Sequence, residues 1–208
     1  MNIRSHIIMG NLLYDCLLKT SNVPLKRSLF VFGNIRPDIY PGIWSAGHTK
    51  DNFLGFIKSE FEQISKINLA RSEEDALSYS LRLGVICHYM TDFFCYPHNA
   101  DFGKGVVAHY IYEKKLCHYL HKRSALLRKI NTFKTENGFL DAQQMVCQIE
   151  LMHEDYMKKR TYWGYDISYA VEICLDVCAS LLLMIEAGTL RLLEDLFNEK
   201  RVLLGHNS

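Results

Sequence analysis

The chain has 208 residues, which is enough for one globular domain with a sizeable core. Apolar residues make up 49% and charged residues 23% of it, a balance that excludes an intrinsically disordered chain. The formal net charge of +1 gives no electrostatic reason to expect binding of nucleic acid or of a strongly acidic partner.

The ends of the chain and its cysteines bear on location. Residues 1–6 lack the apolar stretch and small-residue cleavage site of a secretory signal. The longest apolar run, residues 179–185, is too short to span a bilayer, which leaves peripheral membrane contact open. The seven cysteines are odd in number and scattered within helical apolar patterns, so we expect reduced thiols, a cytoplasmic protein, and small buried hydrophobes at Cys87 and Cys95. No Cys-x-x-Cys pair is present, which argues against a thiolate zinc site. The oligomeric state is left open.

Hydrophobic spacing predicts helices over most of the chain. The first covers residues 3–18, and Pro24 opens a short second helix that ends near Gly33. Residues 36–48 are rich in proline and glycine and are predicted as a loop, and a Ser72 cap opens a later helix. The remaining helices are predicted over residues 52–66, 72–94, 106–130, 140–159 and 167–197. No strand pair with a hairpin turn and no repeat is evident, so we predict one all-α domain over residues 1–208, a multi-helix bundle.

Histidines and carboxylates cluster in the middle of the chain. His88 and Asp92 are four residues apart in one predicted helix, and His109 and Glu113 are four apart in the next. Side chains at this spacing point from the same helix face and can share one cation. Antiparallel packing of the two helices brings both pairs together, with His98 at the turn between them. All five residues are costly to bury unless they are paired or bind metal.

Three further candidates lie upstream, at His6, Asp38 and His48. Together with the central cluster they supply eight nitrogen and oxygen ligands and no sulfur, enough for more than one divalent ion. Mixed imidazole and carboxylate ligands suit zinc best, with manganese or iron as alternatives. The sequence therefore predicts a multinuclear metal site between the helices.

The order and spacing of these residues resemble the bacterial zinc-dependent phospholipase C family. The pattern that carries the resemblance is His6 … Pro37-Asp38 … His48 … His88-Tyr-x-x-Asp92-x-x-x-x-Pro97-His98 … His109-x-x-x-Glu113. The resemblance implies three ion positions, held by Asp38, His48, His88 and Asp92, by His98, His109 and Glu113, and by His6 with Asp92 as a bridge. In the family, the amine and carbonyl of the mature N-terminal residue complete the third position. Here Met1 is the candidate for that role, so we expect two or three zinc ions.

The resemblance implies a zinc-dependent phosphodiester hydrolase in which a metal-bound water attacks the phosphorus of a phospholipid or a related small phosphodiester. Asp38 is the candidate to orient or deprotonate this water, with simple ligation as the alternative role. The aromatic residues near the ligands are candidates to wall a substrate cleft, with an ordinary core role as the alternative. They are Tyr40, Trp44, Phe93 and Tyr96.

Two other functions stay open. A single-strand nuclease or nucleotidase has a similar trinuclear site, but it typically carries Asp at the position of Glu113 and stacks bases on aromatic pockets. A structural or regulatory domain that binds metal without turnover is the second alternative. A basic stretch on the predicted helix at 106–130 is either a solvated face or a phosphate-binding surface. It comprises Lys114, Lys115, Lys122, Arg123, Arg128 and Lys129.

Overall fold

The computed structural model describes residues 1–19, 24–40, 47–67, 72–128, 138–139, 141–159 and 162–205, with side chains left undescribed at 189 and from 191 onward. Within these residues the chain forms helices and no strand, which confirms the all-α class. The α-helices are α1 (Ile3–Leu17), α2 (Arg27–Gly33), α3 (Arg36–Ile39), α4 (Lys50–Ile64), α5 (Glu73–Phe93), α6 (Val106–Leu127), α7 (Ala142–Lys159) and α8 (Trp163–Gly205). Two short 3₁₀ turns, η2 (Tyr96–His98) and η3 (Ala100–Phe102), connect α5 to α6.

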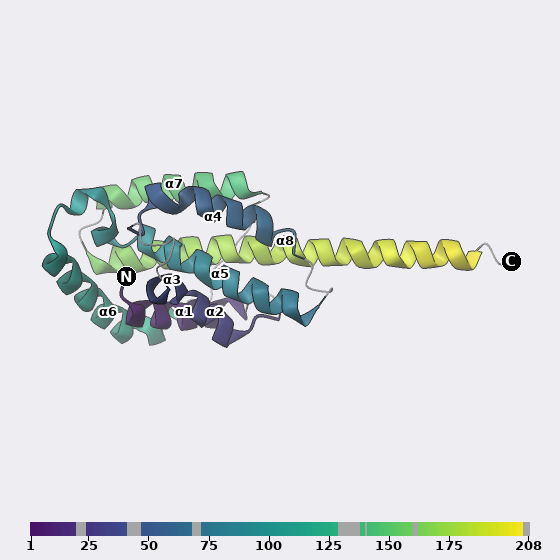
Figure 1. The fold of residues 1–208 in the computed structure, drawn as a ribbon, viewed down its shortest axis with the longest axis horizontal. Helices are drawn as coiled ribbons and strands as arrows, with labels where there is room; N and C mark the ends of the chain where they lie inside the picture. Colours follow the sequence, from purple (N-terminus) through teal and green to yellow (C-terminus); the bar gives the residue numbers. More distant parts are fainter. Residues whose placement is uncertain are drawn as a thin grey trace.

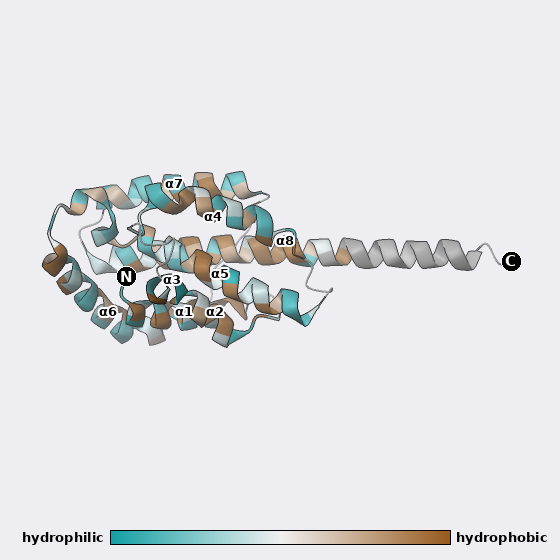
Figure 2. Ribbon diagram, in the orientation of Figure 1, coloured by the Kyte–Doolittle hydropathy of each residue, from teal (hydrophilic) through white to brown (hydrophobic). Residues whose placement is uncertain are grey.

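Helix α8 runs along the inside of the bundle and extends past its end (Figure 1). The segment of α8 beside α5 is strongly apolar (Figure 2), and α5, α7, α1 and α6 all pack against α8. The resulting core includes large, fully buried side chains such as Phe30, Phe61, Tyr79 and Tyr156. In the described part of the chain, no helix is both long and apolar enough to cross a membrane.

Several helix boundaries in the structure differ from those predicted from the sequence. Residues 36–48 were predicted as a loop, but Arg36–Ile39 form the single turn of α3, because proline is tolerated in the first turn of a helix. Helix α2 begins at Arg27, not at Pro24, because the Lys26 amide donates a hydrogen bond to Ser80 Oγ (3.0 Å) and keeps this backbone extended. Helix α8 begins at Trp163, four residues before the predicted start at residue 167.

Polar caps at three helix N-termini fix residues that matter for the site. The Ser72 hydroxyl accepts the Asp75 amide (3.1 Å), which confirms the predicted cap of α5. Asn2 caps α1 by accepting the Ser5 amide (2.9 Å), and Thr49 caps α4. Asn2 directly follows Met1 and Thr49 directly follows His48, so these two caps hold the backbone next to candidate ligands.

Helices α2 and α5 approach each other backbone to backbone. A Cβ atom added to Gly33 or to Gly84 would lie 2.2 Å from a carbonyl oxygen of the facing helix. Only glycine permits this separation. Because of it, the carbonyl of Asn34 reaches the Nδ1 atom of His88 at 2.8 Å.

Candidate metal centre

The structure brings all eight predicted ligand side chains together at the end of the bundle that holds the N-terminus. They come from six segments: His6 from α1, Asp38 from α3, His48 before α4, His88 and Asp92 from α5, His98 from η2, and His109 and Glu113 from α6. Among the described residues, three groups have ligand atoms within 4.8 Å of one another. They are His6, His88 and Asp92; Asp38, His48 and His88; and Cys95, His98 and Glu113.

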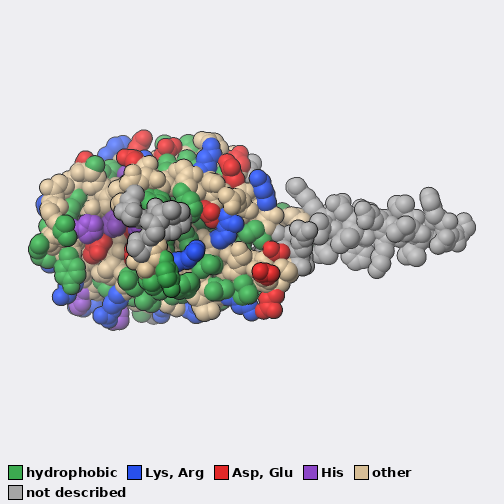
Figure 3. Space-filling model, in the orientation of Figure 1, with side chains coloured by type: hydrophobic (Ala, Val, Ile, Leu, Met, Phe, Trp, Pro, Cys, Tyr) green, Lys and Arg blue, Asp and Glu red, His purple; other side chains and the backbone are tan. Residues whose placement is uncertain are grey.

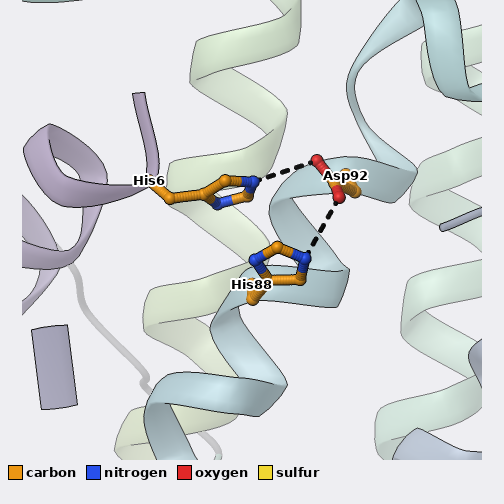
Figure 4. Close-up of side chains that lie close together, drawn as sticks. All are labelled: His6, His88 and Asp92. Atoms are coloured by element: carbon orange, nitrogen blue, oxygen red, sulfur yellow. Dashed lines mark ion pairs between the residues drawn. The ribbon is translucent and has the colours of Figure 1, made fainter. Parts of the chain in front are cut away.

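Asp92 lies at the centre and is fully buried. Its Oδ1 atom is 3.3 Å from His6 Nε2 and 3.7 Å from His98 Nε2. Its Oδ2 atom is 3.0 Å from His48 Nδ1 and 3.4 Å from His88 Nε2. The two oxygens therefore face different sets of imidazoles, as a bridging carboxylate requires (Figure 4).

A second carboxylate, Asp38, faces two of these imidazoles. Its Oδ1 atom lies 3.8 Å from both His48 Nδ1 and His88 Nε2, and those two nitrogens are 2.9 Å apart. With Asp92, the group offers two nitrogen and two oxygen donors from two helices, α3 and α5, and from the loop before α4. This number and kind of donor suits a four-coordinate zinc ion.

In His88 and His6, the Nδ1 atom, which faces away from the carboxylates, forms a hydrogen bond with the protein. His88 Nδ1 donates to the Asn34 carbonyl (2.8 Å), which leaves the Nε2 lone pair facing the carboxylates. Thr91 donates its hydroxyl to the His88 carbonyl (2.8 Å), so it accepts from His6 Nδ1 (3.3 Å). His6 Nε2 is then an acceptor beside the Asp92 oxygen, buried and without a hydrogen-bond partner. Two facing acceptors need a cation between them, so the donor set fits zinc.

Burial and charge set the protonation of the cluster. Burial by itself raises the pKa of Asp92, but the nearby His98, Met1 amine and His6 outweigh burial and hold this pKa well below its ordinary value. Burial lowers the pKa of His88 well below its ordinary value and also lowers the pKa of His98. Ionised carboxylates beside neutral imidazoles are the protonation states that bind metal.

A second set of donors surrounds Glu113. Its Oε1 atom is 3.0 Å from His98 Nε2 and 3.0 Å from His109 Nε2. Cys95 is fully buried, as expected for a small hydrophobe, yet its Sγ atom also lies within 4.8 Å of the ligand atoms of His98 and Glu113. The sequence signal that could have identified it is its position three residues after Asp92 and three before His98.

The amino group of Met1 lies between the two sets. It pairs with Asp92, lies 2.9 Å from His98 Nε2 and is 3.4 Å from Glu113 Oε1. The resemblance implied a position beside His6 and Asp92, and the structure adds His98 and Glu113 to its surroundings. Burial lowers the pKa of this amine, but Asp92, Cys95 and Glu113 outweigh burial and raise the pKa to about 12. The amine must therefore lose a proton before it can bind metal.

Comparison with known proteins addresses the resemblance directly. The family model described as zinc dependent phospholipase C matches residues 5–163. The chain belongs to this family. The matched segment contains all eight candidate ligand side chains and ends at the start of α8. No curated protein and no solved structure matches the chain.

A cavity of about 820 Å³ adjoins the cluster of this phospholipase C relative. Asp38, His98, His109 and Glu113 line one part of it, and the rest follows α6 and the first turn of α1. The Asp38 side chain is 20% exposed, whereas Asp92 is not exposed at all. Asp38 is therefore accessible from the cavity, whereas Asp92 is not.

The predicted substrate-binding aromatic residues that the structure describes do not line this cavity. Phe93 is fully buried, which corrects its assignment to the cleft wall and supports the core alternative. Tyr96 packs edge-on against Phe102 and Tyr112, and it does not line the cavity. Tyr40 is 60% exposed at the end of α3, also outside the cavity lining, and Trp44 lies outside the described residues.

Proposed function

We propose that this protein is a zinc-dependent phosphodiester hydrolase of the phospholipase C type, with two or three zinc ions. The observation that carries the proposal is the fully buried Asp92, whose two oxygens face imidazoles from four different segments. A structural zinc site needs only one four-ligand set, whereas this chain offers donors for several ions. Helices α1, α2 and α4 to α8 contribute to one hydrophobic core, and α3 packs against α2 and α5, which supports a single domain over residues 1–208.

When bound, zinc supplies Lewis acidity that makes hydroxide available near neutral pH and neutralises charge on a phosphodiester. The protein itself holds the carboxylates and imidazoles in place before substrate arrives. Asp38 is the accessible carboxylate of the central set, and burial raises its pKa, with Asp92 adding to the increase and His6 opposing it. Its side chain is 20% exposed and lines the cavity, so a water molecule can reach it. We therefore assign Asp38 the role of orienting the attacking water and accepting its proton at Oδ.

Metal analysis combined with a phosphodiesterase screen tests this function. The screen uses an aryl phosphodiester, short-chain phospholipids, nucleotides and single-stranded DNA. We expect at least two zinc equivalents, and hydrolysis that a chelator removes and added zinc restores. A fully metallated protein that is inert on every substrate contradicts the catalytic proposal and favours a metal-binding domain without turnover. Hydrolysis of DNA alone favours the nuclease alternative.

Blocking the Met1 amino group tests whether it binds zinc. In a chain that begins at Met1, acetylation removes both the charge and the lone pair that face Asp92, His98 and Glu113. We expect zinc content to fall by about one equivalent and turnover to fall about tenfold or more, because a ligand of one ion is lost. Inductively coupled plasma analysis and steady-state kinetics measure the two effects. The control is a protein with a short extension at the C-terminus, which should keep its zinc content and turnover. If acetylation leaves the zinc content unchanged, Met1 is not a ligand.

A further inference from the structure

The cavity beside the metal centre has a basic wall that the proposed zinc chemistry does not use. Arg4 lies in the first turn of α1, and Lys114 lies on α6 directly after Glu113. His118 and His121 continue the Lys114 side of α6 at helical spacing, and all four side chains are exposed and line the cavity. In Figure 3, histidine side chains lie together with lysine and arginine side chains over α6.

The acidic residues among the described lining of this cavity are Asp38 and Glu113, and both belong to the candidate zinc ligands. Arg4 and Lys114 form no ion pair with any carboxylate in the described parts of the chain. The start of α1 also opens into the cavity, and the partial positive charge of a helix N-terminus adds to that of the two side chains. The wall next to the zinc ligands is therefore cationic and available to a ligand.

This wall is unsuitable for a choline head group. Recognition of a quaternary ammonium needs several aromatic faces and benefits from a nearby carboxylate. Apart from imidazoles, the described lining offers one aromatic ring, Tyr110, which is 62% exposed. Lys114 and Arg4 would repel the cation. The same groups favour a phosphate or carboxylate, because Arg and Lys form strong charge-assisted hydrogen bonds with such anions.

We infer that Arg4 and Lys114 form a subsite for a second anionic group of the substrate, so that the preferred substrate is a phosphodiester that also carries a phosphomonoester. This inference rests on the proposed function, because the scissile diester must lie at the zinc ligands while the second phosphate lies along α6. Of the two interpretations of the basic stretch on α6, a solvated face or a phosphate-binding surface, this inference favours the second for Lys114 alone. Lys115, its neighbour, is exposed and does not line the cavity.

The test compares substrates that differ by one phosphomonoester. The lipid pair is short-chain phosphatidylinositol and a short-chain phosphatidylinositol monophosphate. The soluble pair is the p-nitrophenyl ester of thymidine phosphate with and without a further phosphate on the sugar. We expect kcat/KM to favour the phosphorylated member by about tenfold, the size of one charge-assisted contact. A larger preference within the lipid pair indicates a phospholipid substrate, and a larger preference within the soluble pair indicates a nucleotide substrate.

Variants assign the preference to the subsite. Lys114→Met and Arg4→Gln should each reduce the preference several-fold, and the double variant should bring it close to one. The matched control is Lys115→Met, which should retain the full preference, because its side chain lies outside the cavity. An equal loss in Lys115→Met would indicate a general charge effect and would overturn the assignment.

Equilibrium binding separates failure of the subsite from failure of the proposed function. Calorimetry compares inositol phosphate with inositol bisphosphate on the zinc-loaded protein. We expect the bisphosphate to bind about tenfold more tightly, and Lys114→Met to remove this difference. Tighter binding without turnover of any diester supports the subsite and contradicts the phosphodiesterase. Turnover without preference in either pair, and equal binding of the two inositol phosphates, overturns the subsite and leaves the phosphodiesterase in place.

Discussion

Asp92→Asn is expected to reduce turnover about a thousandfold and to lower zinc content by at least one equivalent. The carboxylate has imidazoles on both oxygens and pairs with the Met1 amine, so the change affects every part of the cluster at once. Asparagine keeps the size of the side chain but has a neutral amide with one oxygen, so it cannot bridge two cations. Metal-dependent charge stabilisation contributes several kcal/mol to such a reaction, and about 1.4 kcal/mol corresponds to each tenfold in rate.

Metal analysis and steady-state kinetics on the same preparation measure both effects of Asp92→Asn. The matched control is Glu74→Gln, the same carboxylate-to-amide change on the same helix at an exposed position. The control should keep wild-type zinc content and turnover. If Asp92→Asn keeps full zinc content and loses less than about tenfold in rate, then Asp92 is not the bridge, and the proposed arrangement of the ions is wrong.

Gly84→Ala is expected to destabilise the metal-free protein by about 3 kcal/mol or more, because the new methyl group would meet a backbone that cannot move away easily. Its Cβ atom would lie 2.2 Å from the carbonyl oxygen of Phe30 and 2.9 Å from the Cα atom of Gly33. Helices α2 and α5 must separate to accept it. Separation also draws the Asn34 carbonyl away from His88 Nδ1, so zinc affinity should fall by about tenfold to a hundredfold.

Chemical denaturation of the metal-free protein measures this stability change. The control is Gly55→Ala on α4, where an added Cβ atom meets nothing within 4 Å. There the substitution should stabilise the protein by about 0.5–1 kcal/mol, since alanine is the better helix former. Opposite signs for the two glycines would establish the close helix contact. A neutral or stabilising Gly84→Ala would contradict it.

The local parts of the site could be predicted from the sequence because they depend on neighbours along the chain. Helical periodicity places His88 beside Asp92 and His109 beside Glu113 whatever the rest of the fold does. The Ser72 cap follows from the chemistry of one hydroxyl and one free amide. The ordered set from His6 to Glu113 was enough to identify the family by resemblance, and the family comparison confirms that identification.

Other features depended on how the helices pack. Phe93 is adjacent to Asp92, but helix geometry turns its ring into the core while the carboxylate faces the cluster. Lys114 and Lys115 are likewise neighbours on α6, yet helix geometry directs Lys114 into the cavity wall and leaves Lys115 outside it. Sequence spacing alone does not say which side of α6 faces α1.

The sequence by itself determined the fold class, the helical pairs of ligands and the kind of metal they suit, because each follows from local periodicity and side-chain chemistry. The family resemblance implied that His6, Asp38 and His48 meet those pairs, and the tertiary structure places them there. Only the tertiary structure decided that the Cys95 thiol lies among the donors and that a cationic wall adjoins them. The physical reason is the contact between α2 and α5 at Gly33 and Gly84, together with the packing of α1 on α6, both of which join segments distant in sequence.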